Sequence, residues 1–475
     1  MARRTKILAT LGPASDPPHV LESMIRAGVD AVRLNFSHGT ADEHARRVKA
    51  VRAAAAKVGK DVGVIADLQG PKIRIENFAA GPVMLADGAE FTLDAELPDD
   101  AGDEHRVGIT YKTLPGDVHE GDRLLLNDGQ ITVIVQRVDG PRIVCRVESG
   151  GPLSDHKGIN RAGGGLSAKA LTDKDLRDIK TAAELGADYL AVSFPREAAD
   201  IELARKLLRE AGGDAGIIAK IERSEAIANV EEIIRASDAV MIARGDLGVE
   251  IGDAELPGEQ KRIISMTRDM NRVAIVATQM MESMISSPIP TRAEVLDVAN
   301  AVIDGTDVVM LSAETAAGKY PVKVVEAMAR VCVGAESQRM SPLSRRRREA
   351  KIERIDEAIA MAAMYTANHV GAKAIVALTE SGSTALWMSR VRSGIPIYAM
   401  TRHDSTRCRV TLYRGVYPVR FDVTHGNPDR VLQAAAEELE RLGDVEPGDI
   451  AIFTKGDMTG VSGGTNSMKL MRVGS

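Results

Sequence analysis

Residues 216–246 read GIIAKIERSEAIANVEEIIRASDAVMIARGD, and this stretch decides the fold. It begins with an apolar run, Gly216–Ile221, and a second run, Ala239–Ala243, lies near its end. Strands that are apolar throughout are typical of parallel sheets buried on both faces. Between the runs, Ser224–Arg235 shows helical spacing of its apolar residues, which are Ile227, Val230, Ile233 and Ile234. The stretch therefore predicts one strand–helix–strand unit.

The same rhythm of strand and helix recurs along most of the chain. Another helix is predicted over Leu171–Leu185, with Thr172 as a candidate N-cap. Eight such units predict an α/β fold built on a (β/α)8 TIM barrel. The eight predicted strands are Lys6–Leu11, Ala31–Ser37, Val62–Leu68, Tyr189–Phe194, Gly216–Ile221, Ala239–Ala243, Val273–Thr278 and Asp307–Ser312.

Two segments depart from this rhythm. Between Gly70 and about Gly165, alternating hydrophobicity and turn signals predict a small antiparallel β-barrel lid, with strands at Arg123–Leu126, Ile131–Val138 and Arg142–Val147. After the barrel, a helix and four short runs predict a C-terminal α/β domain with an open sheet: Asp356–Val370, Ala374–Thr379, Ile397–Met400, Val416–Phe421 and Ile450–Thr454. The predicted limits are 1–70 and 166–340 for the barrel, 71–165 for the lid and 341–475 for the C-terminal domain.

Charge and cysteine content exclude several classes of protein. The 475 residues include 61 basic and 67 acidic ones, interspersed, which argues against a nucleic-acid binder. We interpret the basic run Arg345–Arg348 as a solvated linker rather than an anion or RNA patch. Cys145, Cys332 and Cys408 lack CxxC spacing, so neither disulfides nor zinc are indicated. Without a signal peptide or a membrane-length apolar run, we expect a cytoplasmic protein with no membrane contact.

Polar residues gather where the predicted barrel strands end, the place where active sites of such barrels form. Charged groups at several neighbouring strand ends would not be tolerated unpaired in a core. They are Arg33, Asn35, Ser37 and His38 at the end of the second strand, Asp67 at the end of the third, and Lys220 and Glu222 at the end of the fifth. The sixth strand ends in Arg244, Gly245 and Asp246, the seventh in Thr278 and Gln279, and the eighth in Ser312 and Glu314.

Glu222 and Asp246 are the candidate metal ligands. Two carboxylates on adjacent strand ends offer hard oxygen donors and leave positions for water and substrate, as Mg²⁺ prefers. The alternative is that each carboxylate only pairs with Lys220 or Arg244. Strand alternation places Lys220 on the same face as Glu222, so a buried lysine there needs an anionic partner. A phosphate or enolate oxygen suits it, and a Schiff base is the competing use.

Two further groups have both a functional and a structural interpretation. Arg33 could fork onto a substrate phosphate or form only a salt bridge at the barrel end. Asn35, Ser37 and Asp67 form an oxygen-rich set that could hold a monovalent cation or stabilise a local turn.

These residues lie in motifs that resemble the pyruvate kinase family, in the family's order and over essentially the whole chain. The motifs are VRLNFSHG at 32–39, DLQGPKIR at 67–74, AKIE at 219–222, ARGDLGVE at 243–250, ATQMMESM at 277–284, PTRAEV at 290–295 and LSAET at 311–315. The resemblance implies transfer of the phosphoryl group of phosphoenolpyruvate to ADP, the last step of glycolysis. It also implies a homotetramer.

The resemblance also implies roles for single residues. Glu222 and Asp246 would hold Mg²⁺, which Mn²⁺ can replace, and Lys220 would stabilise the phosphoryl group and the enolate. Arg33 would contact the substrate phosphate. Backbone NH groups of Gly245 and Asp246, with Thr278, would hold the carboxylate, and Thr278 is the usual candidate for delivering the proton to the enolate. The residues implied for ADP and ATP are Asn35, His38, Arg74 and Lys157.

Position 72 departs from part of the family. Members that need K⁺ typically carry Glu there, and this chain has Lys72. We therefore expect weak or absent K⁺ dependence, although Asn35, Ser37, Asp67 and the Leu68 carbonyl keep the pattern of the K⁺ site.

The C-terminal domain contains a candidate phosphate loop. Thr379, Ser381, Gly382, Ser383 and Thr384 lie between a predicted strand and a predicted helix, where small hydroxyl residues form phosphate nests. An ordinary capped helix is the alternative. In the family this loop binds a phosphorylated allosteric activator, and the local sequence resembles members that respond to sugar monophosphates or AMP.

Two rival functions share some of these features. A Mg²⁺-dependent barrel lyase or aldolase would share the carboxylate pair but would not need the lid, Arg74 or Lys157. A catalytically silent sensor of phosphorylated metabolites would need only the C-terminal domain, and the intact Lys220, Glu222, Asp246 and Thr278 argue against it.

Overall fold

The computed structural model describes residues 3–337, 352, 354–391, 393–422, 430–457 and 463–474. The predicted strands close into a parallel barrel in the order β1-β16-β15-β14-β13-β12-β3-β2, which confirms the fold class. Their bounds are β1 (Lys6–Thr10), β2 (Ala31–Asn35), β3 (Gly63–Asp67), β12 (Tyr189–Val192), β13 (Gly216–Ile221), β14 (Ala239–Ala243), β15 (Val273–Ala277) and β16 (Val308–Leu311). Several of them, β13 and β14 included, are buried at every residue, as their unbroken apolar runs predict.

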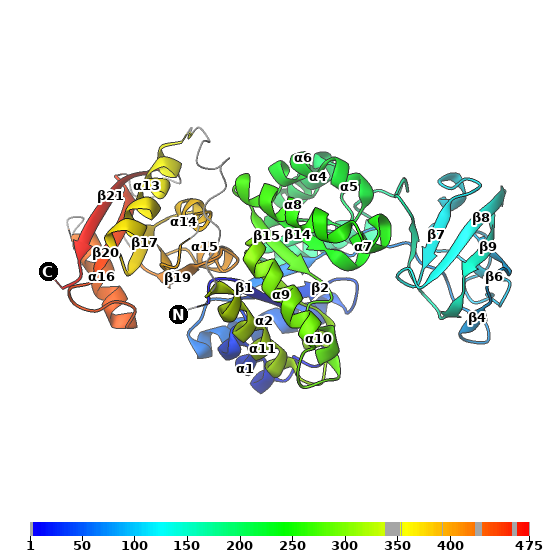
Figure 1. Ribbon diagram of the computed structural model, residues 1–475, viewed down its shortest axis with the longest axis horizontal. Coiled ribbons are helices and arrows are strands. Elements are labelled where there is room, and N and C mark those ends of the chain that lie inside the picture. The colour runs from blue at the N-terminus through cyan, green and yellow to red at the C-terminus, as the bar shows by residue number, and fades with distance from the viewer. Residues whose placement is uncertain are drawn as a thin grey trace.

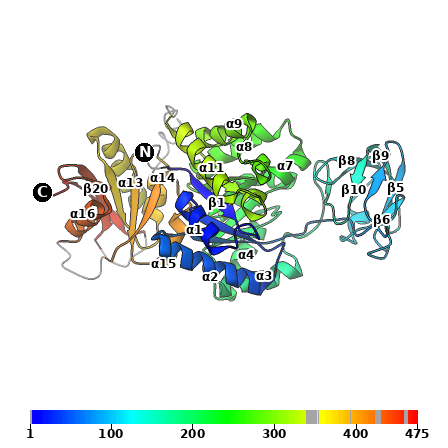
Figure 2. The same cartoon turned by 90° about the horizontal axis from the view of Figure 1, so that it is seen from below.

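Helices surround the barrel (Figures 1 and 2). Thr172 caps α3 as predicted, because its side chain accepts from Asp175 N in a capping box. The helices are α1 (Pro18–Ala27), α2 (Ala41–Val58), α3 (Asp173–Glu184), α4 (Ala198–Glu210), α5 (Ser224–Ala228), α6 (Val230–Ala236), α7 (Arg244–Ile251), α8 (Leu256–Asp269), α9 (Arg292–Asp304), α10 (Ala313–Ala316) and α11 (Pro321–Glu336).

The helix predicted over Ser224–Arg235 is broken in two at Asn229. The side-chain amide of Asn229 donates to the Arg196 carbonyl at 2.9 Å. Asparagine competes in this way with helical backbone hydrogen bonds. The prediction of one continuous helix was therefore wrong.

The inserted segment forms a six-stranded sheet in the order β11-β7-β8-β9-β5-β6 and a two-stranded one, β10-β4. The predicted strands at 123–149 are present and antiparallel, but β5 and β6 pair in parallel, because residues 95–105 return the chain instead of forming a tight hairpin. The bounds are β4 (Val83–Leu85), β5 (Glu90–Asp94), β6 (Arg106–Gly108), β7 (Arg123–Leu126), β8 (Ile131–Asp139), β9 (Arg142–Ser149), β10 (Gly151–Leu153) and β11 (Ile159–Arg161).

The C-terminal domain has the predicted open sheet, in the order β19-β18-β17-β20-β21. The sequence reading missed β21, which pairs antiparallel with β20. The elements are α13 (Ile355–Val370), β17 (Ala374–Leu378), α14 (Ser383–Ser389), β18 (Ile397–Thr401), α15 (Asp404–Val410), β19 (Val416–Arg420), α16 (Val431–Leu442), β20 (Ile450–Gly456) and β21 (Thr465–Arg472). The basic run Arg345–Arg348 lies outside the described residues.

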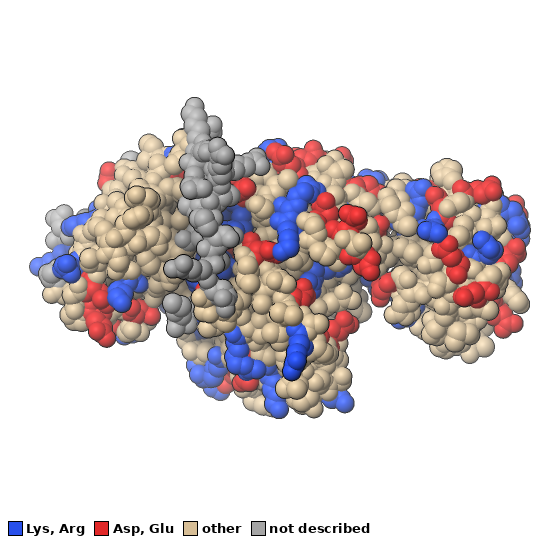
Figure 3. All heavy atoms as spheres, in the orientation of Figure 1, with Lys and Arg blue, Asp and Glu red and all other residues tan. Residues whose placement is uncertain are grey.

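The inserted sheet and the C-terminal domain lie at opposite ends of the barrel (Figure 1). The insert leaves the barrel after β3, at the end where the strands finish. The C-terminal domain packs against the end where strands begin, since Tyr189 donates to the Arg409 carbonyl and Arg390 pairs with Asp307. On the face shown in Figure 3, basic and acidic side chains are mixed. Among the helices that the structure describes, none has both the length and the apolar content needed to cross a bilayer.

Candidate active site

Lys220 lies at the centre of a buried cluster of charges at the barrel mouth. Its Nζ is 2.9 Å from Glu222 Oε1 and 3.4 Å from Asp67 Oδ1. The three residues are 9%, 1% and 0% exposed, respectively. The contact between Lys220 and Glu222 confirms that strand alternation brings both side chains to one face.

Burial and charge act in opposite directions on the pKa values of this cluster. Burial lowers the pKa of Lys220, but the carboxylates of Asp67 and Glu222 outweigh it, so the net shift is upward. For Asp67, burial raises the pKa, and Arg33 and Lys220 reverse this to a net lowering. For Glu222, burial raises the pKa to about 7, because Lys220 offsets it only in part and Asp246 adds repulsion. Burial therefore makes the charged form of Glu222 costly unless a positive charge faces it.

Arg33 forms the salt bridge that the sequence offered as its alternative role. Its Nε donates to Asp67 Oδ2, and its Nη1 lies 3.3 Å from Thr10 Oγ1. Asn35 is the register partner of Asp67 on the neighbouring strand, and its Oδ1 accepts from Ser37 N at 3.1 Å. The structure therefore brings Arg33, Asn35 and Asp67 to one sector of the mouth.

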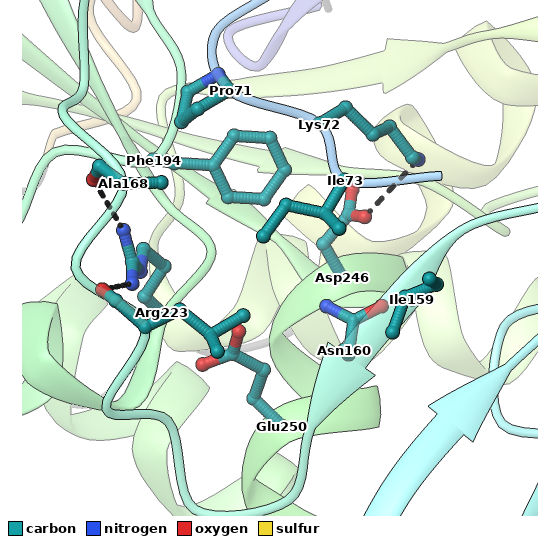
Figure 4. A pocket seen from close by; sticks show the side chains of 11 residues that line it. Pro71, Lys72, Ile73, Ile159, Asn160, Ala168, Phe194, Arg223, Asp246 and Glu250 are labelled. Carbon is teal, nitrogen blue, oxygen red and sulfur yellow. Dashed lines mark hydrogen bonds and ion pairs between the residues drawn. The ribbon is translucent and has the colours of Figure 1, made fainter. Parts of the chain in front are cut away.

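Asp246 lies on the first turn of α7, in a pocket between the barrel mouth and the insert (Figure 4). Its Oδ1 is 3.3 Å from Lys72 Nζ, and Arg244 pairs instead with Asp297 at 2.7 Å. Repulsion from Asp246 contributes to the raised pKa of Glu222, so the two carboxylates are electrostatic neighbours. The alternative to metal binding was that Glu222 pairs with Lys220 and Asp246 with Arg244. The first pair is present, and Asp246 pairs with Lys72 instead of Arg244.

Thr278 and Gly245 meet beside Asp246. Gly245 N donates to Thr278 Oγ1 at 2.8 Å, and this hydroxyl donates to the Ala277 carbonyl at 2.6 Å. Thr278 has a φ of +67°, a conformation that is uncommon outside glycine. The first turn of α7 therefore directs the Gly245 N–H at the Thr278 hydroxyl, which is its acceptor.

The predicted nucleotide residues lie around this mouth without joining the charge cluster. Arg74 and Gly158 form an isolated antiparallel bridge in the insert, and the Arg74 side chain donates to the His156 carbonyl at 2.7 Å. Lys157 is half-buried beside them, and His38 is exposed at the end of the loop that follows β2. Lys72 and Ile73, just before Arg74, line the pocket together with Asp246.

Sequence reasoning missed Ser193 and Phe194, which contact the charged cluster directly. Lys220 Nζ donates to Ser193 Oγ at 2.7 Å, and Phe194 N donates to Glu222 Oε2 at 2.9 Å. Both residues follow β12, which with β1 is one of the two barrel strands whose ends were not considered for polar groups. A serine at that position is the signal that could have found them.

The carboxylates fit a divalent ion that takes few ligands from the protein. Among the residues that the structure describes, no group of three or more His, Cys, Asp or Glu side chains is arranged for a metal. Glu222 and Asp246 would offer hard oxygen atoms from neighbouring strand ends, with water and substrate as the remaining ligands. That donor set suits Mg²⁺, which keeps several waters and binds through one or two carboxylates and substrate phosphates.

The loop before α14 has the predicted small residues. Gly382, with a φ of +83°, donates from N to Thr379 Oγ1 at 2.9 Å, and the Ser381 and Ser383 hydroxyls are 3.1 Å apart. Thr384 differs, since its hydroxyl is buried against Thr465 Oγ1 at 2.7 Å.

Comparisons with known proteins agree with the barrel and with the C-terminal domain. The model of the pyruvate kinase barrel domain matches residues 2–325, and that of the pyruvate kinase alpha/beta domain matches residues 357–471. The chain belongs to the pyruvate kinase family. It is 54% identical to pyruvate kinase II of Salmonella typhimurium over 99% of both chains. It is 53% identical to the pyruvate kinase of Haemophilus influenzae over 96% of both, and 40% identical to that of Mycobacterium tuberculosis over 100% of this chain and 99% of the relative.

As a pyruvate kinase, the chain transfers the phosphoryl group of phosphoenolpyruvate to ADP and yields pyruvate and ATP. The family membership therefore decides against the two rival functions, a barrel lyase or aldolase and a catalytically silent sensor.

Proposed function

We propose that Lys220, Glu222 and Asp246 form the phosphoryl-transfer centre of this pyruvate kinase, with Arg33 on the substrate phosphate. The observation that supports it best is the buried cluster in which Lys220 Nζ contacts Glu222 at 2.9 Å and Asp67 at 3.4 Å. Burying charged groups costs desolvation free energy on folding. Such preorganised charges can stabilise the charge that develops in a transition state.

The chemistry divides among these residues according to charge. Phosphoryl transfer has a loose transition state with charge spread over the phosphoryl oxygens, so catalysis depends on positioning and charge stabilisation. Lys220 stabilises the phosphoryl group and the developing enolate, and Arg33 orients the substrate phosphate. Glu222 and Asp246 would hold Mg²⁺, or Mn²⁺ in its place. The chemistry that such an ion supplies when bound is charge neutralisation on phosphate and enolate oxygens.

The other end of the substrate is assigned to the start of α7. The substrate carboxylate takes the place that Thr278 Oγ1 occupies on Gly245 N, with Asp246 N as a second donor. Thr278 is then placed to relay a proton to the enolate carbon. Asn35, His38, Arg74 and Lys157 are assigned to the nucleotide, which enters between the mouth and the insert.

Replacing Lys220 tests the central assignment. Lys220→Met should abolish ADP-dependent pyruvate release in a coupled assay while Mn²⁺ binding is largely kept. Lys261→Met is the matched control, because Lys261 pairs only with Asp304 on the surface. The assignment fails if Lys220→Met turns over like the control.

We also propose that K⁺ is not required. Lys72 Nζ already supplies a positive charge 3.3 Å from Asp246, the Leu68 carbonyl accepts from Ser193 Oγ, and both oxygens of Asp67 face Arg33 or Lys220. Turnover should be comparable in sodium, potassium and large organic cation buffers. Lys72→Glu should create K⁺ dependence, and a wild-type enzyme that is inactive without K⁺ would refute the proposal.

The loop before α14 is proposed to bind a phosphorylated activator through Thr379, Ser381, Gly382 and Ser383, with Thr384 contributing backbone only. Activity should be titrated with AMP, a sugar monophosphate and fructose 1,6-bisphosphate. Ser381→Asp should remove the response and keep basal turnover, because a carboxylate repels phosphate.

A homotetramer is the proposed assembly. Exposed apolar side chains that a second subunit could cover include Ile289 just before α9, Leu296 on α9, and Ile355 and Tyr365 on α13. Leu296→Glu and Tyr365→Glu should each reduce the mass measured by light scattering, and a monomeric wild type would refute the proposal.

A further inference from the structure

Ser193 connects the catalytic lysine to the backbone of a neighbouring strand. It follows β12, is 1% exposed, and accepts from Lys220 Nζ at 2.7 Å. Its own hydroxyl proton goes to the Leu68 carbonyl, also at 2.7 Å. The hydroxyl is thereby fixed in direction, with its lone pairs facing the ammonium.

The backbone of Phe194 holds Glu222, the carboxylate that contacts Lys220. Its N donates to Glu222 Oε2 at 2.9 Å, and Glu222 Oε1 is the atom that contacts Lys220. Phe194 has a φ of +53°. An aromatic residue adopts this left-handed conformation only where its surroundings enforce it, and such residues cluster at functional sites.

The same turn is packed against the root of the insert. A Cβ on Gly70 would lie 2.8 Å from Ser193 Cβ and 3.1 Å from the Phe194 ring. The ring lies next to Pro71 and above Ile73 in the pocket that contains Asp246 (Figure 4). The turn therefore touches the charge cluster on one side and the first connection to the insert on the other.

We propose that Ser193 and Phe194 are positioning residues. They orient Lys220 and Glu222 so that the lysine can contact the substrate and the carboxylate can bind a divalent ion, although the two side chains touch. The Lys220 ammonium has three N–H donors, and Asp67, Glu222 and Ser193 face them. With Ser193 as a neutral acceptor, one N–H of the ammonium is directed away from Glu222. Glu222 Oε1 faces Lys220 and Oε2 accepts from Phe194 N, so each oxygen keeps one further lone pair for a divalent ion. This inference rests on the roles of Lys220 and Glu222 proposed above.

The test removes the hydroxyl and compares it with a serine outside the site. Ser193→Ala should lower kcat about 10–100-fold and weaken Mn²⁺ binding about tenfold, the usual range for partners that orient ligands. KM for ADP should stay unchanged. Ser237→Ala is the matched control, since Ser237 is equally buried and donates to the Ile233 carbonyl at 2.7 Å. Ser237→Ala should lower the melting temperature as much as Ser193→Ala does, and it should leave kcat and Mn²⁺ binding as in the wild type.

The outcomes separate positioning from mere packing. Losses of kcat and Mn²⁺ affinity in Ser193→Ala, with Ser237→Ala normal, support the proposal. A normal Ser193→Ala, or equal losses in both variants, overturns it. If Ser193→Ala does not fold, Ser193→Cys decides with the same readouts, because a thiol is a weak acceptor of similar size. An active Lys220→Met would instead refute the proposed function, so the two failures can be told apart.

Discussion

At the scale of single residues, the barrel mouth is organised around carboxylates that are shared between cations. Asp67 is fully buried and faces both Arg33 and Lys220. Strand alternation was sufficient to predict that Lys220 and Glu222 share a face. It could not predict Ser193 and Phe194, because the apolar run Tyr189–Phe194 was read as strand to its end and a left-handed φ has no sequence signal in a phenylalanine.

Asp67→Asn should lower the free energy of unfolding by about 3 kcal/mol at pH 7, because it leaves buried cations short of a partner. The pKa of Asp67 is lowered in the folded protein. Its contribution is therefore complete above the ordinary carboxyl pKa of about 4 and is lost as the pH falls below it. The difference between wild type and variant in chemical unfolding should therefore stay constant from pH 7 down to about pH 4 and shrink as the pH falls below 4.

A surface pair gives the control for this prediction. Asp304→Asn removes the partner of Lys261, an exposed residue, and should cost at most about 1 kcal/mol both at pH 7 and below pH 4. An Asp67→Asn penalty that is absent at pH 7, or that does not shrink below pH 4, would contradict the account.

At the scale of elements, the barrel strands and the cap of α3 followed from the sequence, and the helix break and the parallel pairing in the insert did not. Thr172 begins α3 with a capping box, as predicted. Thr40 and Thr291 cap α2 and α9 in the same way, and these two caps were not predicted. The break at Asn229 depends on the Arg196 carbonyl, which comes from a distant loop. The parallel pairing of β5 with β6 likewise depends on the path of the connection, which composition does not determine.

Gly70→Ala tests how closely the insert's connection and the β12 turn must approach. Gly70 has a φ of +65°, and an added Cβ would meet Ser193 at 2.8 Å. We expect at least a tenfold loss of kcat together with a lower melting temperature. Gly81→Ala has a φ of +84° and nothing within 4 Å, so it carries the conformational cost of about 1–2 kcal/mol without the contact. Equal kcat in the two variants would show that the approach is unimportant.

At the scale of the whole molecule, the barrel joins the C-terminal domain through a buried ion pair. Arg390, which follows α14, is fully buried and contacts Asp307 just before β16, and Asp307 also accepts from Ala274 N. The loop that is proposed to bind an activator lies at the other end of α14. The sequence predicted the two folding units, but a contact between residues 83 positions apart could not be read from local patterns.

Arg390→Met should destabilise the junction by about 3–5 kcal/mol, because it leaves Asp307 buried without its cation. Scanning calorimetry should show a lower melting temperature or a separate transition for the C-terminal domain. Arg441→Met, which removes an exposed pair with Glu438, should leave the transition within about 1 kcal/mol of wild type. A melting curve for Arg390→Met that matches Arg441→Met would rule out this role.

The account depends most on Glu222 and Asp246 sharing one divalent ion beside Lys220. A crystal structure with Mn²⁺ and phosphoenolpyruvate, phased on the Mn²⁺ anomalous signal, tests this directly. The account predicts a single strong peak bonded to carboxylate oxygens of both residues at about 2.0–2.2 Å, with the substrate phosphate in contact with Lys220 Nζ. A peak away from either carboxylate, or a substrate phosphate out of reach of Lys220, would contradict it.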